Sequence, residues 1–173
     1  MDINHCCCFT GHRPEKLHIP ESVVLQELNI AITAALQDGH TTFISGMAKG
    51  VDIWAAELIL ERRRASPEIN LICAIPYEGF GLHWKDEWTE RFTRIIHAAN
   101  SVEYVSKEFS RPSFQRRNKW MVDRSSLLIA AYTGASGGTK NTIKYAEHKG
   151  IKIQRICATG IGPVSYTHLR AHE

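Results

Sequence analysis

Residues 45–57 read Ser-Gly-Met-Ala-Lys-Gly-Val-Asp-Ile-Trp-Ala-Ala-Glu, and the predicted fold is organised around this stretch. It follows the apolar run 42–44 and leads into a segment rich in helix-forming residues. A strand that ends in glycines and passes into the first turn of a helix leaves several backbone N–H groups without partners. The helix dipole adds to the attraction of these groups for anions. The stretch therefore predicts the floor of a crevice that binds phosphate or a nucleotide.

Outward from this stretch, short apolar runs alternate with segments of helical periodicity. Strands are expected at residues 6–9, 41–45, 69–75, 101–105, 127–132 and 151–156, with Pro76 ending the third. Helices are expected at residues 20–38, 51–64, 83–100, 114–124 and 139–149. Strands that alternate with helices form mainly parallel sheets covered on both faces, so the expected class is α/β with about six strands. In such sheets ligands bind at the carboxyl ends of the strands, near the point where the strand order reverses.

The composition indicates one globular domain over residues 1–157. The net charge of +3 is small for 173 residues and argues against strong non-specific binding to nucleic acids. Residues 158–173 have no helical or strand period, so we expect a non-native or disordered tail there and leave it out of the site.

The five cysteines and the apolar runs bear on the compartment. Their number is odd and three of them are adjacent in an apolar run, so we expect buried free thiols in a reducing, cytoplasmic environment. A membrane-spanning helix needs about 20 apolar residues, and no run approaches this length, so no membrane partner is expected.

Three strand ends carry the residues typical of an anion site. After the first strand, Thr10 offers a hydroxyl, Gly11 allows close approach of a ligand, and Arg13 has a guanidinium that can bind phosphate. After the second strand, Gly46 and Gly50 are interpreted as the residues that permit a tight turn. After the fifth strand, a glycine-rich turn at 134–138 opens a helix.

Two acids and a lysine near the second turn have alternative roles. Lys49 can neutralise phosphate charge, and Asp52 can either cap the helix or bind a ribose hydroxyl. Glu57 is either a ligand residue, or a surface charge that pairs with an arginine.

Residues 115–123 add polar groups on the predicted fourth helix. Gln115 and Asn118 share one side of the helix and are expected at the mouth of the crevice, whereas Arg116 and Lys119 are either phosphate-binding or solvated. Thr139 is interpreted as the N-cap of the last helix, a position that also suits phosphate binding. The full set of expected ligand-binding residues is Thr10, Gly11, Arg13, Ser45, Gly46, Met47, Gly50, Asp52, Glu57, Gln115, Arg117, Asn118, Gly137, Gly138 and Thr139.

Four ordered motifs resemble those of the YpsA-like family of the SLOG superfamily. They are the segments 9–17, 46–57, 117–123 and 137–139, and the resemblance covers residues 5–156. It implies a Rossmann-like three-layer fold, a nucleotide-derived ligand such as ADP-ribose, NAD or AMP, and self-association into a homo-oligomer. Relatives of the cytokinin-activating phosphoribohydrolase type use a PGGxGTxxE motif, of which only residues 137–139 match here.

The sequence therefore predicts binding or sensing of a nucleotide-derived small molecule, with no required cofactor and no metal. No catalytic set is recognisable, so catalysis is not expected; an enzyme with this site would be a nucleotide N-glycosidic hydrolase. A third alternative follows from the resemblance to DNA-processing protein A, whose relatives share a turn like residues 45–52 and bind single-stranded DNA. The basic and aromatic residues of 116–120 offer limited support for this alternative.

Overall fold

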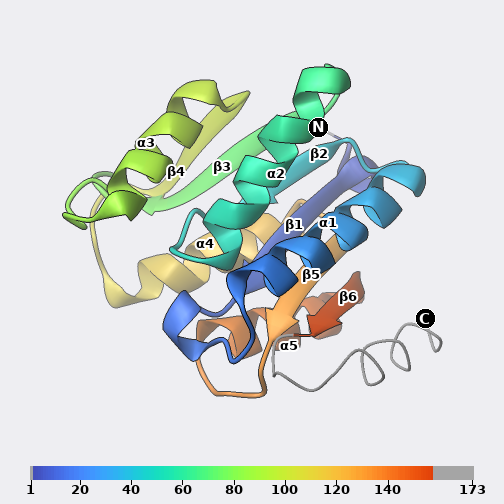
Figure 1. Cartoon of the computed structure of the whole chain (residues 1–173). Helices are drawn as coiled ribbons and strands as arrows, with labels where there is room; N and C mark the ends of the chain where they lie inside the picture. The colour runs from blue at the N-terminus through green and yellow to red at the C-terminus, as the bar shows by residue number, and fades with distance from the viewer. Residues whose placement is uncertain (1, 158–173) are drawn as a thin grey trace.

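The computed structural model describes residues 2–157, and this part of the chain forms an α/β fold (Figure 1). Its strands are β1 (Cys6–Gly11), β2 (Thr42–Ser45), β3 (Asn70–Tyr77), β4 (Ser101–Ser106), β5 (Leu127–Tyr132) and β6 (Lys152–Cys157). Its helices are α1 (Glu21–Gln37), α2 (Val51–Ala65), α3 (Glu87–Ala98), α4 (Arg111–Asp123) and α5 (Gly138–Lys149). The predicted tail, 158–173, lies outside the described residues, and the domain boundary at 157 stays a prediction.

The six strands form one parallel sheet in the order β4-β3-β2-β1-β5-β6. β1 lies near the centre, where Cys8 is in register with Ile44 of β2 and Leu128 of β5. The chain places β2 to β4 on one side of β1 and then crosses to β5 and β6 on the other side. The strand order therefore reverses between β1 and β5. The predicted fold class, a Rossmann-like three-layer α/β fold with a mainly parallel sheet, is confirmed.

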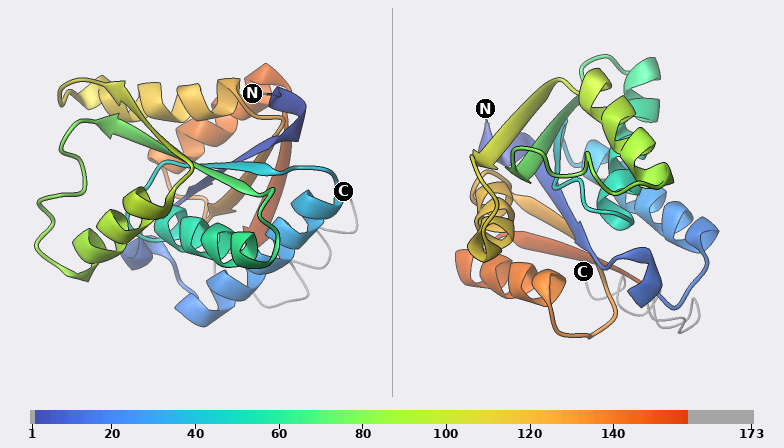
Figure 2. Two further views of the ribbon diagram at one scale, coloured as in Figure 1. Left: turned by 90° about the horizontal axis from the view of Figure 1, so that it is seen from above. Right: turned by 90° about the vertical axis from the view of Figure 1, so that its left-hand side faces the viewer.

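The helices cover both faces of the sheet, with α1, α2 and α3 on one face and α4 and α5 on the other (Figure 2). Alternate residues of each strand enter the two cores: Cys7 and Phe9 pack toward α1–α3, whereas Cys8 packs toward α4 and α5. Successive side chains of a strand point to opposite faces, so a strand in the middle layer is apolar throughout. This accounts for the continuous apolar runs of β1 and β5.

Several predicted boundaries differ from the structure, and two of the differences have a clear physical reason. β3 does not end at Pro76 but continues to Tyr77, which is in register with Ser106, because proline is compatible with extended backbone. The helix predicted over 83–100 begins only at Glu87. Lys85 has a φ of +60°, and the carboxylate of Asp86 accepts the N–H of Trp88 at 2.9 Å as the N-cap.

The four cysteines of β1 and β3 are buried, as predicted. Cys6, Cys7, Cys8 and Cys73 have free thiols, and burial raises the pKa of Cys8 and of Cys73 to about 12. Such thiols stay protonated and inert at neutral pH. Within residues 2–157, none of the helices combines the length and the apolar character of a membrane span.

The contact between β1 and α2 predicts the effect of adding one methyl group. A Cβ at Gly11 would lie 2.5–2.7 Å from three side-chain atoms of Val51, closer than real atoms approach. Gly11→Ala is therefore expected to lower the free energy of unfolding by about 1–3 kcal/mol in urea denaturation, the usual cost of overpacking. The control is Gly138→Ala, whose Cβ would meet its nearest neighbour, Asn118, at 3.9 Å. Equal stability of the two variants would contradict this interpretation.

Candidate functional site

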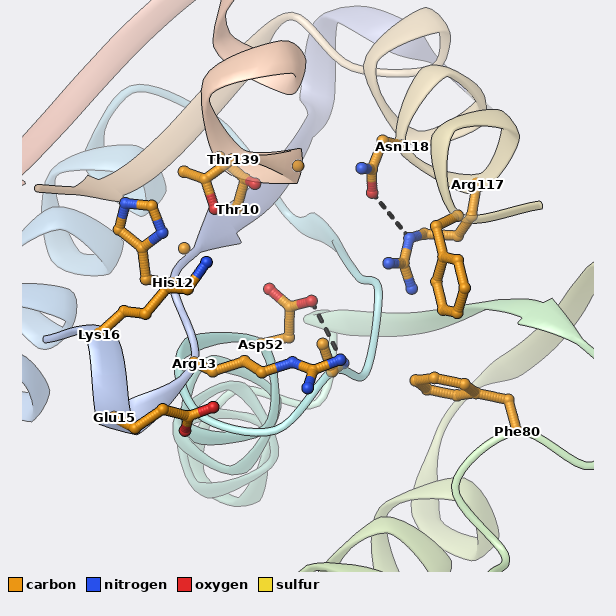
Figure 3. Close-up of a pocket in the computed structure, with 14 residues that line it drawn as sticks. Thr10, His12, Arg13, Glu15, Lys16, Asp52, Phe80, Arg117, Asn118 and Thr139 are labelled. Atoms are coloured by element: carbon orange, nitrogen blue, oxygen red, sulfur yellow. Dashed lines mark hydrogen bonds between the residues drawn. The ribbon is translucent and has the colours of Figure 1, made fainter. Parts of the chain in front are cut away.

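A cleft of about 370 Å³ lies at the carboxyl ends of β1 and β5, where the strand order reverses (Figure 3). Its walls come from the loop after β1, the start of α2, the loop after β3, α4 and the first turn of α5. The lining residues are Thr10, Gly11, His12, Arg13, Glu15, Lys16, Ala48, Asp52, Phe80, Phe114, Arg117, Asn118, Gly138 and Thr139. The cleft thus occupies the place where doubly wound sheets bind ligands.

One end of the cleft has a net positive charge, because Arg13 and Lys16 outnumber the carboxylate of Glu15 there. The loop after β1 leads through a short 3-10 helix, Pro14–Lys16, which exposes the side chains of Arg13 and Lys16 along the cleft. Among residues 2–157, neither cation lies within ion-pair distance of a carboxylate. The Lys16 ammonium lies close to the start of α5, since a Cβ at Gly137 would be 3.9 Å from Lys16 Nζ. The positive end of the α5 dipole and the Lys16 ammonium therefore both attract an anion at the start of α5.

His12 brings a buried ring nitrogen to the same end. The residue is 4% exposed, its ring lies 5.5 Å from that of Tyr132, and its Nε2 atom has no hydrogen-bond partner within the described chain. Burial, with help from Lys16 and His18, lowers the pKa of His12. The ring is thus kept neutral, with one nitrogen free to bind a ligand or water.

The turn between β2 and α2 uses its own polar groups internally. Ser45 Oγ donates to the carbonyl of Asp52 at 2.7 Å and accepts the N–H of Met47 at 3.2 Å. The N–H of Ala48 donates to Asp52 Oδ2 at 3.2 Å. Because the carboxylate of Asp52 sits in the first turn of α2, it also complements the positive end of that helix. The anion-binding capacity expected of this turn is therefore satisfied by Asp52.

The second oxygen of Asp52 faces the cleft. Asp52 is 6% exposed, and its Oδ1 atom is buried and has no hydrogen-bond partner among residues 2–157. Burial raises the pKa of Asp52 to about 6, while Arg117 and the N–H of Ala48 oppose the rise. A buried carboxylate oxygen with no partner is an acceptor for a ligand hydroxyl.

Arg117 connects α4 with the turn after β2. Its Nε donates to Asn118 Oδ1 at 2.8 Å (Figure 3). Its Nη1 donates to the carbonyl of Gly46, directly after the end of β2. A Cβ at Gly46 would lie 2.9 Å from Arg117 Nη1, so the glycine makes room for the guanidinium. Burial lowers the pKa of Arg117, and the nearby Asp52 opposes this change. Arg117 thus holds the turn, with one face still lining the cleft.

Eight of the fifteen predicted ligand residues line this cleft, and seven do not. Those that line it are Thr10, Gly11, Arg13, Asp52, Arg117, Asn118, Gly138 and Thr139. Those that do not are Ser45, Gly46, Met47, Gly50, Glu57, Gln115 and Gly137.

The contacts of three residues bear on their predicted roles. Glu57 takes the second of its two predicted roles, since it forms a two-point ion pair with Arg91 of α3, at 3.0 and 2.5 Å. Lys49 pairs with Asp86 at 2.6 Å instead of pointing to the cleft. The N-cap of α5 is Gly137, and Thr139 lies inside the first turn.

The backbone strain of the second turn is also distributed differently from the prediction. Its positive φ angles belong to Met47, at +62°, and to Gly50, at +94°, whereas Gly46 is needed for the contact with Arg117. Met47 is fully buried, so its side chain belongs to the core.

The sequence reasoning missed six lining residues: His12, Glu15, Lys16, Ala48, Phe80 and Phe114. Four of them, His12, Glu15, Lys16 and Ala48, lie inside the motifs 9–17 and 46–57, so counting every polar residue of segment 9–17 would have found three. Phe80 had a separate signal, because it stands between two glycines in the loop that follows a predicted strand.

The buried carboxyl of Asp52 predicts a dependence of stability on pH. The folded protein holds this proton up to about pH 6, whereas an unfolded Asp releases it near 3.8, so folding binds protons between these values. The free energy of unfolding is thus expected to fall by about 2 kcal/mol between pH 4 and pH 7 through this group. In urea denaturation, the free energy of unfolding of wild type is expected to fall by this amount between pH 4 and pH 7 relative to that of Asp52→Asn. Glu61→Gln, which removes an exposed carboxylate, is the charge control; parallel profiles of wild type and Asp52→Asn would contradict the assignment.

Comparison with known proteins gives relatives of the same size and structures of the same fold. The model of YpsA, described as the YspA SLOG family, matches residues 7–159. The SPbeta prophage-derived protein YoqJ of Bacillus subtilis is 28% identical over 142 residues, which are 74% of this chain and 83% of that protein. The UPF0398 protein of Bacillus thuringiensis strain Al Hakam is 27% identical over 150 residues, 82% of each chain.

Two solved structures of DNA processing protein A are similar in fold. The protein from Streptococcus pneumoniae has a TM-score of 0.63 at 16% identity, covering 98% of this chain and 56% of its own. The protein from Helicobacter pylori has a TM-score of 0.61 at 22% identity, covering 87% of this chain and 64% of its own. This chain thus spans less than two thirds of either protein, and the likeness concerns the fold. Since the family model matches most of its length, the chain belongs to the YpsA SLOG family.

Proposed function

We propose that the cleft binds a nucleotide or a nucleotide-derived ligand of the AMP, ADP-ribose or NAD type. The observation that carries the proposal is the convergence of groups without partners. Two residues with a buried polar atom that has no hydrogen-bond partner in the described chain, Asp52 (Oδ1) and His12 (Nε2), line the same cleft as the cations Arg13 and Lys16. Buried polar atoms are nearly always hydrogen-bonded, so a ligand or water is expected to complete them.

The phosphate is expected at the cationic end. The first turn of α5 offers the N–H groups of Gly138 and Thr139, and Lys16 stands beside this helix end. An anion there gains from the helix dipole, from the free N–H donors and from the lysine at once. Arg13 is exposed and adds a second cation along the cleft.

The sugar is expected near Asp52. A carboxylate accepts hydrogen bonds from the hydroxyl groups of a ribose, as an acidic residue does in dinucleotide-binding folds. A carboxylate is unfavourable next to a phosphate, which supports the separation of the two ligand groups along the cleft. The same buried carboxyl would also be the natural acid or base if the protein cleaved the N-glycosidic bond.

Binding of single-stranded DNA is a second candidate, supported by charges on the outer face of α4 and α5. Arg116, Lys119 and Lys144 are exposed there. Lys119 Nζ lies 5.4 Å from the ring of Tyr145, and Arg124 lies 4.1 Å from the ring of Trp120. Aromatic and cationic side chains together are typical of surfaces that bind single strands, and the Helicobacter pylori DNA processing protein A is described as binding single-stranded DNA.

One binding experiment separates the candidates. The protein is titrated calorimetrically with AMP, ADP-ribose, NAD and a short oligodeoxynucleotide, and each nucleotide mixture is then analysed for free base. At least one nucleotide is expected to bind, and Lys16→Ala is expected to weaken that binding about tenfold or more through loss of a charge-assisted contact.

The matched control is Lys107→Ala, which removes an exposed lysine that does not line the cleft. Its affinity for the nucleotide is expected to equal that of wild type. Binding of the oligonucleotide alone would replace the proposal with the second candidate. Release of free base would add hydrolysis to binding.

A further inference from the structure

Two aromatic rings line the cleft in addition to its polar groups. Phe80 comes from the loop after β3, and Phe114 comes from the first half of α4. Their ring centroids are 6.1 Å apart and the ring planes are inclined by 72°. In Figure 3, Phe80 lies at the opposite end of the cleft from Lys16 and His12, with Asp52 between the two ends. The cleft therefore has a cationic end and an aromatic end.

The two rings are held in place by further aromatic residues. The ring centroid of Phe80 lies 5.2 Å from that of Trp84 and 6.0 Å from that of Phe92, and both pairs are packed edge to face. Phe114 contacts Tyr77 at 5.9 Å, also edge to face. These are the preferred arrangements of aromatic pairs, and each adds to the stability that burial already provides. Aromatic contacts on both rings therefore hold the wall formed by Phe80 and Phe114 in position.

The backbone on either side of Phe80 consists of glycines with positive φ. Phe80 stands between Gly79, with a φ of +91°, and Gly81, with a φ of +87°. A Cβ at Gly81 would lie 2.7 Å from the ring of Phe92, so a larger residue would push the supporting ring away. Positive φ is available to glycine at little cost, so the two glycines that flank Phe80 permit the backbone turn in which its side chain is presented.

A phosphate and a sugar do not account for this wall. Both are recognised by charges and hydrogen bonds, which the Lys16 end and Asp52 supply, whereas the flat ring of a base gains from aromatic contact. The cleft volume of about 370 Å³ lies near the lower limit of the roughly 300–1,000 Å³ typical of ligand pockets. This size favours a mononucleotide over a dinucleotide.

We infer that Phe80 and Phe114 form the base-binding wall of the cleft, so that the protein selects a nucleoside monophosphate over a sugar phosphate. This inference rests on the proposed function. The base packs against the two rings, the sugar hydroxyls meet Asp52, and the phosphate lies between Lys16 and the start of α5. The wall recognises the presence of a planar base, and its contacts do not require a particular pattern of hydrogen bonds.

The test compares AMP with ribose 5-phosphate, which carries the same sugar and phosphate without a base. In calorimetric titrations, wild type is expected to bind AMP at least tenfold more tightly than ribose 5-phosphate. Phe80→Leu and Phe114→Leu keep an apolar side chain and remove the aromatic ring. Each is expected to weaken AMP binding about five- to twentyfold and to leave the affinity for ribose 5-phosphate within twofold of wild type.

The matched control is Phe109→Leu. Phe109 belongs to the same aromatic cluster, 6.1 Å from Phe114, but it is 59% exposed and does not line the cleft. Its variant is expected to bind both compounds as wild type does. Equal affinity of wild type for the two compounds, or equal weakening of both in the Phe80 and Phe114 variants, would overturn the base wall and leave the proposed function standing. If neither compound bound but ADP-ribose or NAD did, the selection of a nucleoside monophosphate would be overturned, whereas the proposed function would fail only if none of the three nucleotides bound.

Discussion

The hydrogen bond from Arg117 to the carbonyl of Gly46 is the contact on which the geometry of the cleft depends. It connects α4, on one face of the sheet, with the turn that follows β2, and it places a buried cation beside the buried carboxyl of Asp52. Removing one partner of such a pair leaves the other charge buried and uncompensated, which is costly. The glycine, the arginine and the aspartate therefore act together, although they are 71 residues apart at the widest. The contact thus holds the turn after β2 against α4.

This contact also explains how the charges of the cleft are divided. Asp52 satisfies the N–H of Ala48 and the start of α2, so α2 no longer attracts an external anion. The start of α5 has no such acid in its first turn and stands beside Lys16. Both helices follow glycine turns, but their N-termini differ. The start of α5 can therefore bind a phosphate, whereas the start of α2 presents a carboxylate that can accept a hydrogen bond from a hydroxyl. A ligand that carries both groups at opposite ends of a sugar fits this separation, and the aromatic wall adds a place for a base.

The sequence was sufficient for the fold because its information is local. Buried strands such as β1 and β5 are continuous apolar runs, and the helices between them keep a clear period, so the parallel sheet follows from the alternation. The site was only partly predictable. Thr10, Asp52 and Thr139 stand at strand ends and helix starts, which topology brings together. The pairing of Glu57 with Arg91, and that of Lys49 with Asp86, depend on how α3 packs, which no local pattern encodes. The aromatic wall was missed for the same reason, since Phe80 and Phe114 meet only in three dimensions.

A crystal structure of the protein grown with AMP is the strongest test of nucleotide binding in the cleft, because it locates the ligand as well as detecting it. We expect electron density for the nucleotide in the cleft. Its phosphate should contact the first turn of α5 and Lys16, a sugar hydroxyl should lie within hydrogen-bond distance of Asp52 Oδ1, and the base should lie on Phe80. Density for the nucleotide on the outer face of α4 and α5, with the cleft filled by solvent alone, would contradict it.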